Sequence, residues 1–166
     1  MNILQILAGN RNQKGFEAFD KAGHKRKIGD ILVAAGIIGE EQREAALAEQ
    51  KRVGRQHLGT ILVKMGYTKE EIIGRVLASQ RRVPFVRLEE VSVDADVLAL
   101  VDRDLVMRHL CIPLHATSDR IVLGMANPFD LVAIEDFETV TGRCIEPVGV
   151  TPSDVAAAAG RFYGYI

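Results

Sequence analysis

The sequence of 166 residues is poor in cysteine, lacks any long apolar run and contains no lysine after Lys69. No stretch approaches the ~18 consecutive apolar residues that a membrane-spanning helix requires. The N-terminal segment 1–14 places its apolar residues before its charges, which is the reverse of a secretory signal. These absences predict a soluble, cytoplasmic protein with no export signal and no direct membrane insertion.

Cysteine and histidine are too few and too scattered to indicate a disulfide or a metal site. The two cysteines, Cys111 and Cys144, lie in apolar segments and form no CxxC pair. Such cysteines are typical of buried free thiols in a reducing compartment. The four histidines show no metal-ligand spacing. We therefore predict neither a metal nor a cofactor.

The absence of lysine after Lys69 is part of a charge asymmetry between the two halves of the chain. Residues 1–80 contain thirteen Lys and Arg against nine Asp and Glu, a net charge of +4. Residues 81–166 contain eight against thirteen, a net charge of −5. The first half is basic enough to favour an anionic ligand, but too weakly basic to indicate a nucleic-acid-binding surface.

Catalytic motifs are also missing. The segment 54–60, GRQHLGT, has glycine spacing like that of a Walker A loop, but it lacks the phosphate-binding lysine and follows no predicted strand. Asp94 and Asp96 could form a carboxylate pair, although helix capping and solvent exposure explain them better. We predict that the chain is not an enzyme.

The sequence does contain an internal repeat. Residues 27–50 and 57–80 align without gaps and are identical at ten of 24 positions. Apolar residues at i, i+3, i+4 and i+7 predict a helix at the start of each unit. Gly36 and Gly66 are expected to end these helices. Each unit is therefore predicted to be a helical hairpin.

The second helix of each hairpin has a weaker start signal. Thr68 and Glu71 have the spacing of a capping box in the second unit, whereas the first unit offers only Gly39. A further helix is predicted from residues 2–20.

Beyond residue 83, β-rich runs alternate with helical stretches. Asp94 is placed to cap a helix over about 95–109 that breaks near Asp102, and Asp130 one that ends before Gly142. Thr151, followed by proline, is a good helix start. The predicted strands are Val83–Leu88, Cys111–His115, Arg120–Ala126 and Cys144–Val150.

These elements predict an α+β fold. An N-terminal helical bundle of two tandem helical hairpins would precede a small α/β sandwich-like subdomain. The predicted divisions are an N-terminal helical segment over 1–24, the tandem-repeat subdomain over 25–82 and the α+β subdomain over 83–166.

The repeated pattern, RLGxxLLxxGLLxxxxLxxALxxQ, resembles the cyclic di-GMP-binding motif at the N-terminus of some type II secretion and type IV pilus assembly ATPases. The second half resembles the rest of that domain, the N-terminal domain of general secretion pathway protein E. Its cues are Val83–Val86 with Leu88, Ile112–Leu114, Met125–Pro128, Thr141–Gly142 and Arg161–Gly164.

The resemblance covers residues 25–164 and implies a non-catalytic regulatory and docking domain. The ATPase core that follows in the family is absent from this chain. The implied partners are the motor domain and an inner-membrane platform protein, which would place the domain in the cytoplasm and peripherally at the inner membrane. The implied ligand is cyclic di-GMP.

In the family's ligand-binding members each motif holds one half of the cyclic dinucleotide. Each motif opens with a basic residue and a glycine at a helix start, where phosphate can bind, and closes with a glutamine that offers a donor and an acceptor. Apolar pairs such as Leu32–Val33 could form walls for a base. The first motif offers Lys27, Ile28, Gly29, Leu32, Val33, Gly36, Ile37, Leu47 and Gln50. The second offers His57, Leu58, Gly59, Leu62, Val63, Gly66, Tyr67, Leu77 and Gln80.

Four features depart from the family pattern. Lys27 replaces an arginine and loses its planar fork, Arg43 and Thr68 occupy apolar positions, and the spacer 51–56 is one residue longer. They predict modest affinity. The alternative function is docking to an inner-membrane platform protein without nucleotide binding. Its partner surface would lie on residues 2–20, with Leu4, Ile6, Leu7 and Phe16.

Overall fold

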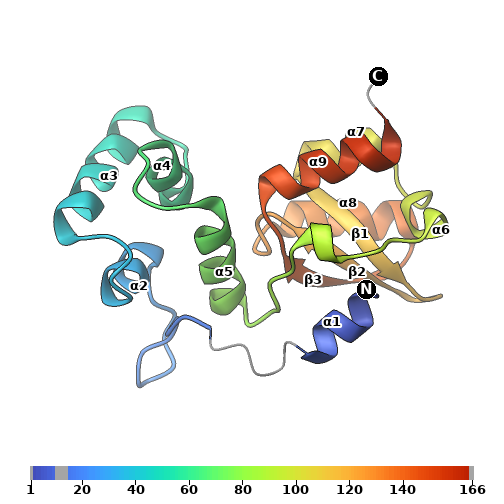
Figure 1. Cartoon of the computed structure of the whole chain (residues 1–166), viewed down its shortest axis with the longest axis horizontal. Coiled ribbons are helices and arrows are strands. Elements are labelled where there is room, and N and C mark those ends of the chain that lie inside the picture. The colour runs from blue at the N-terminus through green and yellow to red at the C-terminus, as the bar shows by residue number, and fades with distance from the viewer. Residues whose placement is uncertain (1, 10–14, 165–166) are drawn as a thin grey trace. The chain divides into compact units, whose positions relative to one another are not determined.

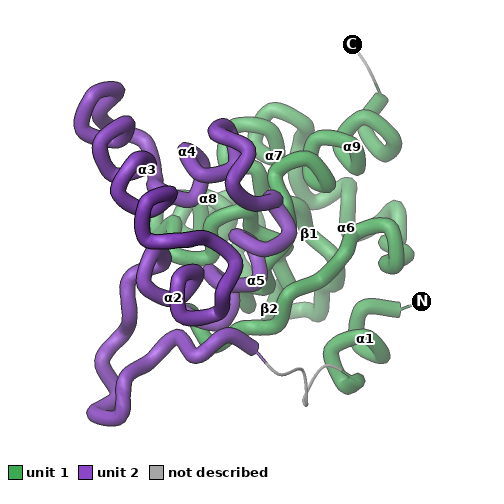
Figure 2. Tube along the Cα trace, turned by 60° about the vertical axis from the view of Figure 1, so that its left-hand side comes forward, with its two compact units in different colours: residues 1–13, 81–166 green, residues 14–80 purple. Residues whose placement is uncertain are grey.

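A computed structural model describes residues 2–9 and 15–164, which divide into two compact units (Figure 1, Figure 2). Unit 2 comprises Lys14–Gln80 and therefore contains both repeats. Unit 1 comprises Met1–Gln13 and Arg81–Ile166. Each unit has its own cluster of buried apolar side chains. The α+β class is confirmed, because unit 2 is helical and unit 1 contains a three-stranded sheet.

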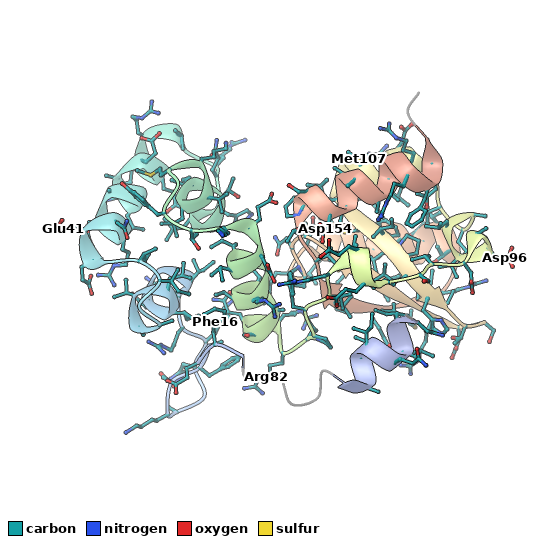
Figure 3. The ribbon with its side chains drawn as sticks, in the orientation of Figure 1. Phe16, Glu41, Arg82, Asp96, Met107 and Asp154 are labelled. Carbon is teal, nitrogen blue, oxygen red and sulfur yellow. The ribbon has the colours of Figure 1, made fainter. Side chains whose placement is uncertain are left out.

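Unit 2 is built from two helical hairpins. The first consists of α2 (Ile28–Ala34) and α3 (Glu40–Val53), and the second of α4 (Leu58–Lys64) and α5 (Glu70–Arg81). The helices α2, α3 and α4 pack on one another. Glu41, labelled in Figure 3, lies on the exposed side of α3, whereas Ala46 on the same helix is fully buried.

The turn within each hairpin forms as the glycines predict. Gly36 has a φ of 73° and Gly66 a φ of 76°, values that glycine adopts without a steric penalty. The Gly36 N–H donates to the Val33 carbonyl and the Ile37 N–H to the Leu32 carbonyl, both at 3.0 Å, which is the Schellman pattern. The second repeat has both bonds at 3.0 Å, from Gly66 to Val63 and from Tyr67 to Leu62.

The prediction that Thr68 caps α5 is wrong. The helix begins at Glu70, one residue later than the capping box requires, and the Thr68 hydroxyl is buried with no hydrogen-bond partner among the described residues. In the first repeat, by contrast, Gly39 caps α3 and its N–H donates to Gln42 Oε1 at 3.0 Å. The position of Thr68 corresponds to Ile38, a core residue, so packing rather than capping determines its place.

The sheet of unit 1 has the order β1-β2-β3. Its strands are β1 (Cys111–Ala116), β2 (Arg120–Met125) and β3 (Cys144–Gly149), as the sequence predicts. β1 and β2 are antiparallel, with a register shift between Pro113 and His115, and β2 and β3 are parallel. Five of the six residues of β2 are buried, so both faces of the sheet are covered.

The predicted strand Val83–Leu88 is wrong. Only Phe85 forms a bridge, with Gly149 of β3, and Leu88–Glu90 form the short 3-10 helix η2. Gly149 donates its N–H to the Pro84 carbonyl at 2.8 Å. Backbone groups alternate between the two sides of a strand, so every second residue of β3 counted from Gly149 directs its backbone groups towards the segment around Phe85. Pro147 is one of them and has no N–H to donate, which stops the pairing after one bridge.

Beyond residue 94, the α-helices of unit 1 begin at the predicted caps Asp94, Asp130 and Thr151, or at the predicted break near Asp102. They are α6 (Ala95–Leu98), α7 (Arg103–His109), α8 (Leu131–Thr141) and α9 (Pro152–Tyr163), and the break before α7 falls at Asp102 as predicted. Asp102, Asp130 and Thr151 each accept an N–H three residues on. α7 and α9 pack side by side and both contact β1 (Figure 1). Asp154 of α9 accepts the Leu88 N–H of η2 at 3.3 Å (Figure 3).

The N-terminal helix is shorter than predicted. α1 spans Ile3–Gly9, residues 10–14 lie outside the described part, and residues 15–27 contain no helix. Ile6 and Leu7 pack into the core of unit 1, and Phe16 packs into that of unit 2. Of the four apolar residues expected on a docking surface, only Leu4 is exposed, at 49%. The others serve the folding of the two units.

The cysteines are free, and the prediction that both are buried is half right. Cys111 is fully buried and burial raises the pKa of its thiol, whereas Cys144 is exposed at the start of β3. Among the described residues, no group of His, Cys, Asp or Glu side chains could hold a metal ion. Within the same ranges, no helix is long and apolar enough to cross a membrane.

Tyr163 provides a test of unit 1 through its pH dependence. Its hydroxyl donates to the Leu98 carbonyl at 2.8 Å, and burial together with the Asp102 carboxylate raises the pKa of Tyr163 to about 12. We expect Tyr163→Phe to lower the free energy of unfolding by about 1 kcal/mol at neutral pH. Because the folded state favours the neutral phenol, this difference should persist below pH 10 and shrink as the pH rises towards 12.

Denaturant unfolding of both proteins across this pH range measures the effect. Tyr67→Phe serves as control, because the Tyr67 hydroxyl has no hydrogen bond within the described part of the chain. A difference that stayed constant up to pH 12 would contradict the prediction.

Candidate functional site

The candidate site is the tandem motif of unit 2, whose two repeats have nearly the same local geometry. Lys27 precedes α2 with φ −71° and ψ 147°, and His57 precedes α4 with φ −70° and ψ 142°. Both residues are exposed, and the next two positions are half-buried and buried in each repeat. The structure therefore presents two equivalent basic or potentially basic side chains, each at a helix start.

The longer spacer does not disturb this equivalence. α3 continues to Val53, and Gly54 then adopts φ 63° and ψ 166°, a combination almost confined to glycine. Arg55 follows with a φ of 41°. These two residues reverse the chain so that His57 enters α4 at the same backbone angles as Lys27 enters α2.

The motif glycines allow the two repeats to approach closely. A Cβ atom built on Gly59 would lie 2.7 Å from Ile73 Cγ2 and 3.4 Å from Ile28 Cδ1. One built on Gly29 would lie 3.2 Å from Arg43 Cδ and 3.3 Å from Leu58 Cδ2. Each glycine is thus covered by α3 or α5 of its own repeat and by the second motif residue of the other repeat.

Arg43 fits its apolar position because its stem and its head have separate roles. The stem packs over Gly29 where Ile73 packs over Gly59. The guanidinium reaches Asp30 at 2.7 Å and Glu40 at 2.5 Å. Burying an arginine stem while its charged head reaches the surface is common on helices. The departure from the apolar pattern therefore leaves the packing of the first hairpin in place.

The closing glutamines form a crossed pair of hydrogen bonds. Gln80 Nε2, from the second repeat, donates to the Arg26 carbonyl at 2.8 Å, next to the start of the first repeat. Gln50 Nε2, from the first repeat, donates to the Gln56 carbonyl at 2.9 Å, next to the start of the second. The end of each motif therefore lies beside the beginning of the other.

The apolar members of the motif differ in exposure. Leu32 and Leu62 are 0% exposed and belong to the core of unit 2, so neither offers surface to a ligand in this structure. Val33 and Val63, the next residues, are half-buried and pack at the edge of the same core. A surface wall for a base would therefore come from the valines.

The remaining predicted residues lie farther along each hairpin. Gly36 and Gly66 are exposed at the turns, where Ile37 and Tyr67 follow. Ile28 and Leu58 are half-buried where the repeats meet, and Leu47 and Leu77 are half-buried on α3 and α5. The structure thus brings Lys27 together with Gln80, and His57 with Gln50, while the turn residues belong to the other end of each hairpin.

Sequence reasoning missed the backbone groups of this site. The carbonyls of Arg26 and Gln56 each stand immediately before a motif and accept the crossed bonds. Gln56 Oε1 also accepts from Lys64 Nζ at 3.2 Å, which adds a cation beside the start of the second motif. The only available signal was position, because both residues directly precede an opening basic residue.

Comparison with known proteins identifies the class of domain. The MshEN domain matches residues 81–165, about half of the chain, and the chain belongs to this family. The match covers the second half of the sequence, which carries the cues beyond the tandem motif. This chain is an N-terminal domain of the regulatory type found in secretion and pilus assembly ATPases, and the match is not to a catalytic core.

Two curated relatives are type IV pilus assembly ATPases named PilB. The Myxococcus xanthus protein is 29% identical over 137 residues, and the Thermus thermophilus protein is 30% identical over 140 residues. These stretches cover 82% and 83% of this chain. They cover only 24% and 16% of the two relatives, so the chain spans a quarter or less of their length.

Solved structures extend the similarity over both units. A structure of MshE with cdg, cyclic di-GMP, is 29% identical, has a TM-score of 0.72 and covers 84% of this chain and 100% of that one. The N-terminal domain of XpsE has the same fold at 16% identity, with a TM-score of 0.64 and coverage of 85% and 100%. The resemblance to the N-terminal domain of secretion and pilus ATPases is therefore confirmed.

Proposed function

We propose that this domain binds cyclic di-GMP through residues 27–80 and thereby regulates a secretion or pilus assembly ATPase. The observation that carries the proposal is the preserved two-fold geometry of the tandem motif in a chain similar to MshE, a protein solved with cyclic di-GMP. A ligand with two equivalent halves suits two equivalent helix starts. The net charge of +4 on residues 1–80 favours a dianionic ligand.

The proposed mechanism is binding without chemistry. Lys27 and His57, which are exposed at equivalent positions, would contact the two phosphates. Val33 and Val63 would contribute apolar surface, and the close packing at Gly29 and Gly59 would hold the two halves at a fixed separation. The ligand would then shift how the domain engages its partner, to the extent that it binds one arrangement more tightly.

The partners and location are part of the proposal. The domain would act in the cytoplasm beside an ATPase motor domain, and an inner-membrane platform protein would hold it peripherally at the membrane. The similarity to the two pilus assembly ATPases supports the motor domain as a partner.

Calorimetric titration of cyclic di-GMP into the folded chain tests the ligand. We expect selective saturable binding, with GTP and cyclic di-AMP as negative controls. Lys27→Ala and His57→Ala should each weaken binding about tenfold, because each removes a charge-assisted contact. The absence of heat at millimolar ligand, from a demonstrably folded sample, would leave a docking module without a nucleotide as the better account.

Lys69→Ala is the matched control. It removes one exposed positive charge from the same unit, but at the turn end of the second hairpin, three residues after Gly66. A loss as large as that of Lys27→Ala would show that general charge, and not the motif, attracts the ligand.

A further inference from the structure

We infer that Gln50 and Gln80 are positioning residues that act across the repeats, so that each half of the site is assembled from both motifs. The inference rests on the proposed function for its ligand measurement, but its structural part is independent of any ligand. In this inference, the closing glutamine of each motif positions the opening residue of the other motif.

The first support is the pair of crossed bonds. Gln80 and Arg26 are 54 residues apart, and the bond of 2.8 Å joins the end of α5 to the segment that leads into α2. Gln50 holds the segment that leads into α4 at 2.9 Å. Each acceptor carbonyl belongs to the peptide bond whose nitrogen is that of Lys27 or His57. A displacement of either peptide would therefore move the exposed side chain that follows it.

The second support is burial. Gln80 is 9% exposed, one of the two buried polar residues of the described chain, and Gln50 is half-buried. A buried amide donor that loses its partner costs free energy, so these side chains have a strong preference for one position. Each amide nitrogen uses one of its two N–H donors in a backbone bond, and this bond fixes the orientation of the side chain, as a positioning role requires.

The third support is a pair of apolar contacts between the repeats, one at each motif glycine. Ile28 packs near Gly59, and Leu58 packs near Gly29. The second residue of each motif thus contacts the other motif, as the last residue does. Polar and apolar contacts both link the start of each helix to the opposite repeat.

A ligand-free measurement tests the positioning directly. Gln80→Met and Gln50→Met keep the side-chain length and remove the donor. We expect Gln80→Met to shift the carbonyl ¹³C resonance of Arg26 and the amide ¹⁵N resonance of Lys27, with Gln56 and His57 unmoved. Gln50→Met should give the reverse pattern. Shifts confined to a variant's own repeat, or no shift at either acceptor, would overturn the inference.

Double-variant titrations with cyclic di-GMP test the effect on the site. Each methionine variant should weaken binding about five- to tenfold. Gln80→Met should add little to Lys27→Ala, because both affect the same half-site, whereas it should add its full loss to His57→Ala. Gln50→Met should couple to His57→Ala instead. Coupling within a repeat would overturn the inference.

Gln42→Met provides the matched control. Gln42 also bonds a backbone group in unit 2, but that group is the Gly39 N–H at the start of α3. A purely structural loss should couple to neither opening residue, so this variant separates positioning from general destabilisation. If the wild-type chain shows no binding, the proposed function fails, and the resonance measurement still decides whether the glutamines act across the repeats.

Discussion

Replacing Leu62 with alanine should lower the free energy of unfolding of unit 2 by about 2–5 kcal/mol. The side chain is 0% exposed and belongs to the core that Leu32, Ile61 and Val76 also form. Truncation removes buried apolar surface and leaves a cavity that the short helix α4 can fill only in part. Denaturant unfolding, with amide exchange read separately for α2–α5, measures the loss in this unit.

Val63→Ala is the control for this prediction. Val63 follows Leu62 directly but is half-buried, so its truncation should cost much less. If the ligand contacts the motif through the valines, Val63→Ala should weaken cyclic di-GMP binding more than it destabilises the fold. A small loss of stability in Leu62→Ala would contradict its place in the core and return Leu62 to the candidate binding surface.

Replacing Gly59 with alanine should destabilise unit 2 by about 1–3 kcal/mol. The new Cβ would lie 2.7 Å from Ile73 Cγ2, a branch carbon that cannot swing away because isoleucine is restricted at χ1. This overpacking should exceed the gain of up to about 1 kcal/mol that alanine has over glycine in a helix. Thermal or denaturant unfolding measures the change.

Gly29→Ala is the matched substitution in the other repeat. Its nearest neighbour is Arg43 Cδ at 3.2 Å, part of a flexible stem that can shift by a few tenths of an ångström. The higher helix propensity of alanine should then offset most of the overpacking, so the free energy of unfolding should change by no more than about 1 kcal/mol. Equal losses at both glycines would show that the interface between the repeats, rather than Ile73, sets the tolerance.

Local signals in the sequence predicted most of the elements. Gly36, Gly66 and Gly142 mark helix ends because each needs a positive φ, and the structure shows all three. Asp130 and Thr151 mark helix starts because their side chains accept nearby N–H groups, and Asp102, predicted only as a break, accepts one in the same way. These signals depend on residues within four positions of one another, so no knowledge of the fold is needed.

The errors arose where distant residues decide the outcome. The pairing of Val83–Leu88 stops at one bridge because Pro147, about 60 residues away, faces that edge. Thr68 fits a capping box by spacing, yet its repeat position belongs to the core. Ile6 looked available for a partner because nothing in the first nine residues indicates that they pack against the sheet unit.

The candidate site shows the same division. The resemblance selected the motif positions, and the structure places Lys27 and His57 in equivalent exposed settings. The roles of Gln50 and Gln80 could not follow from the motif, because their acceptors are the backbone carbonyls of the residues just before the opposite repeat. Every residue has a main-chain carbonyl, so the type of residue at a position does not indicate that its carbonyl is an acceptor.

The crossed bonds of Gln50 and Gln80 also make the pair of repeats a closed arrangement. In an open solenoid each repeat joins only its neighbours, and the terminal repeats leave faces that need caps. Here the glutamine of each repeat donates a hydrogen bond to the carbonyl just before the other repeat. The two bonds are reciprocal, as the contacts of two subunits are across an isologous interface. The exchange is closed after two members.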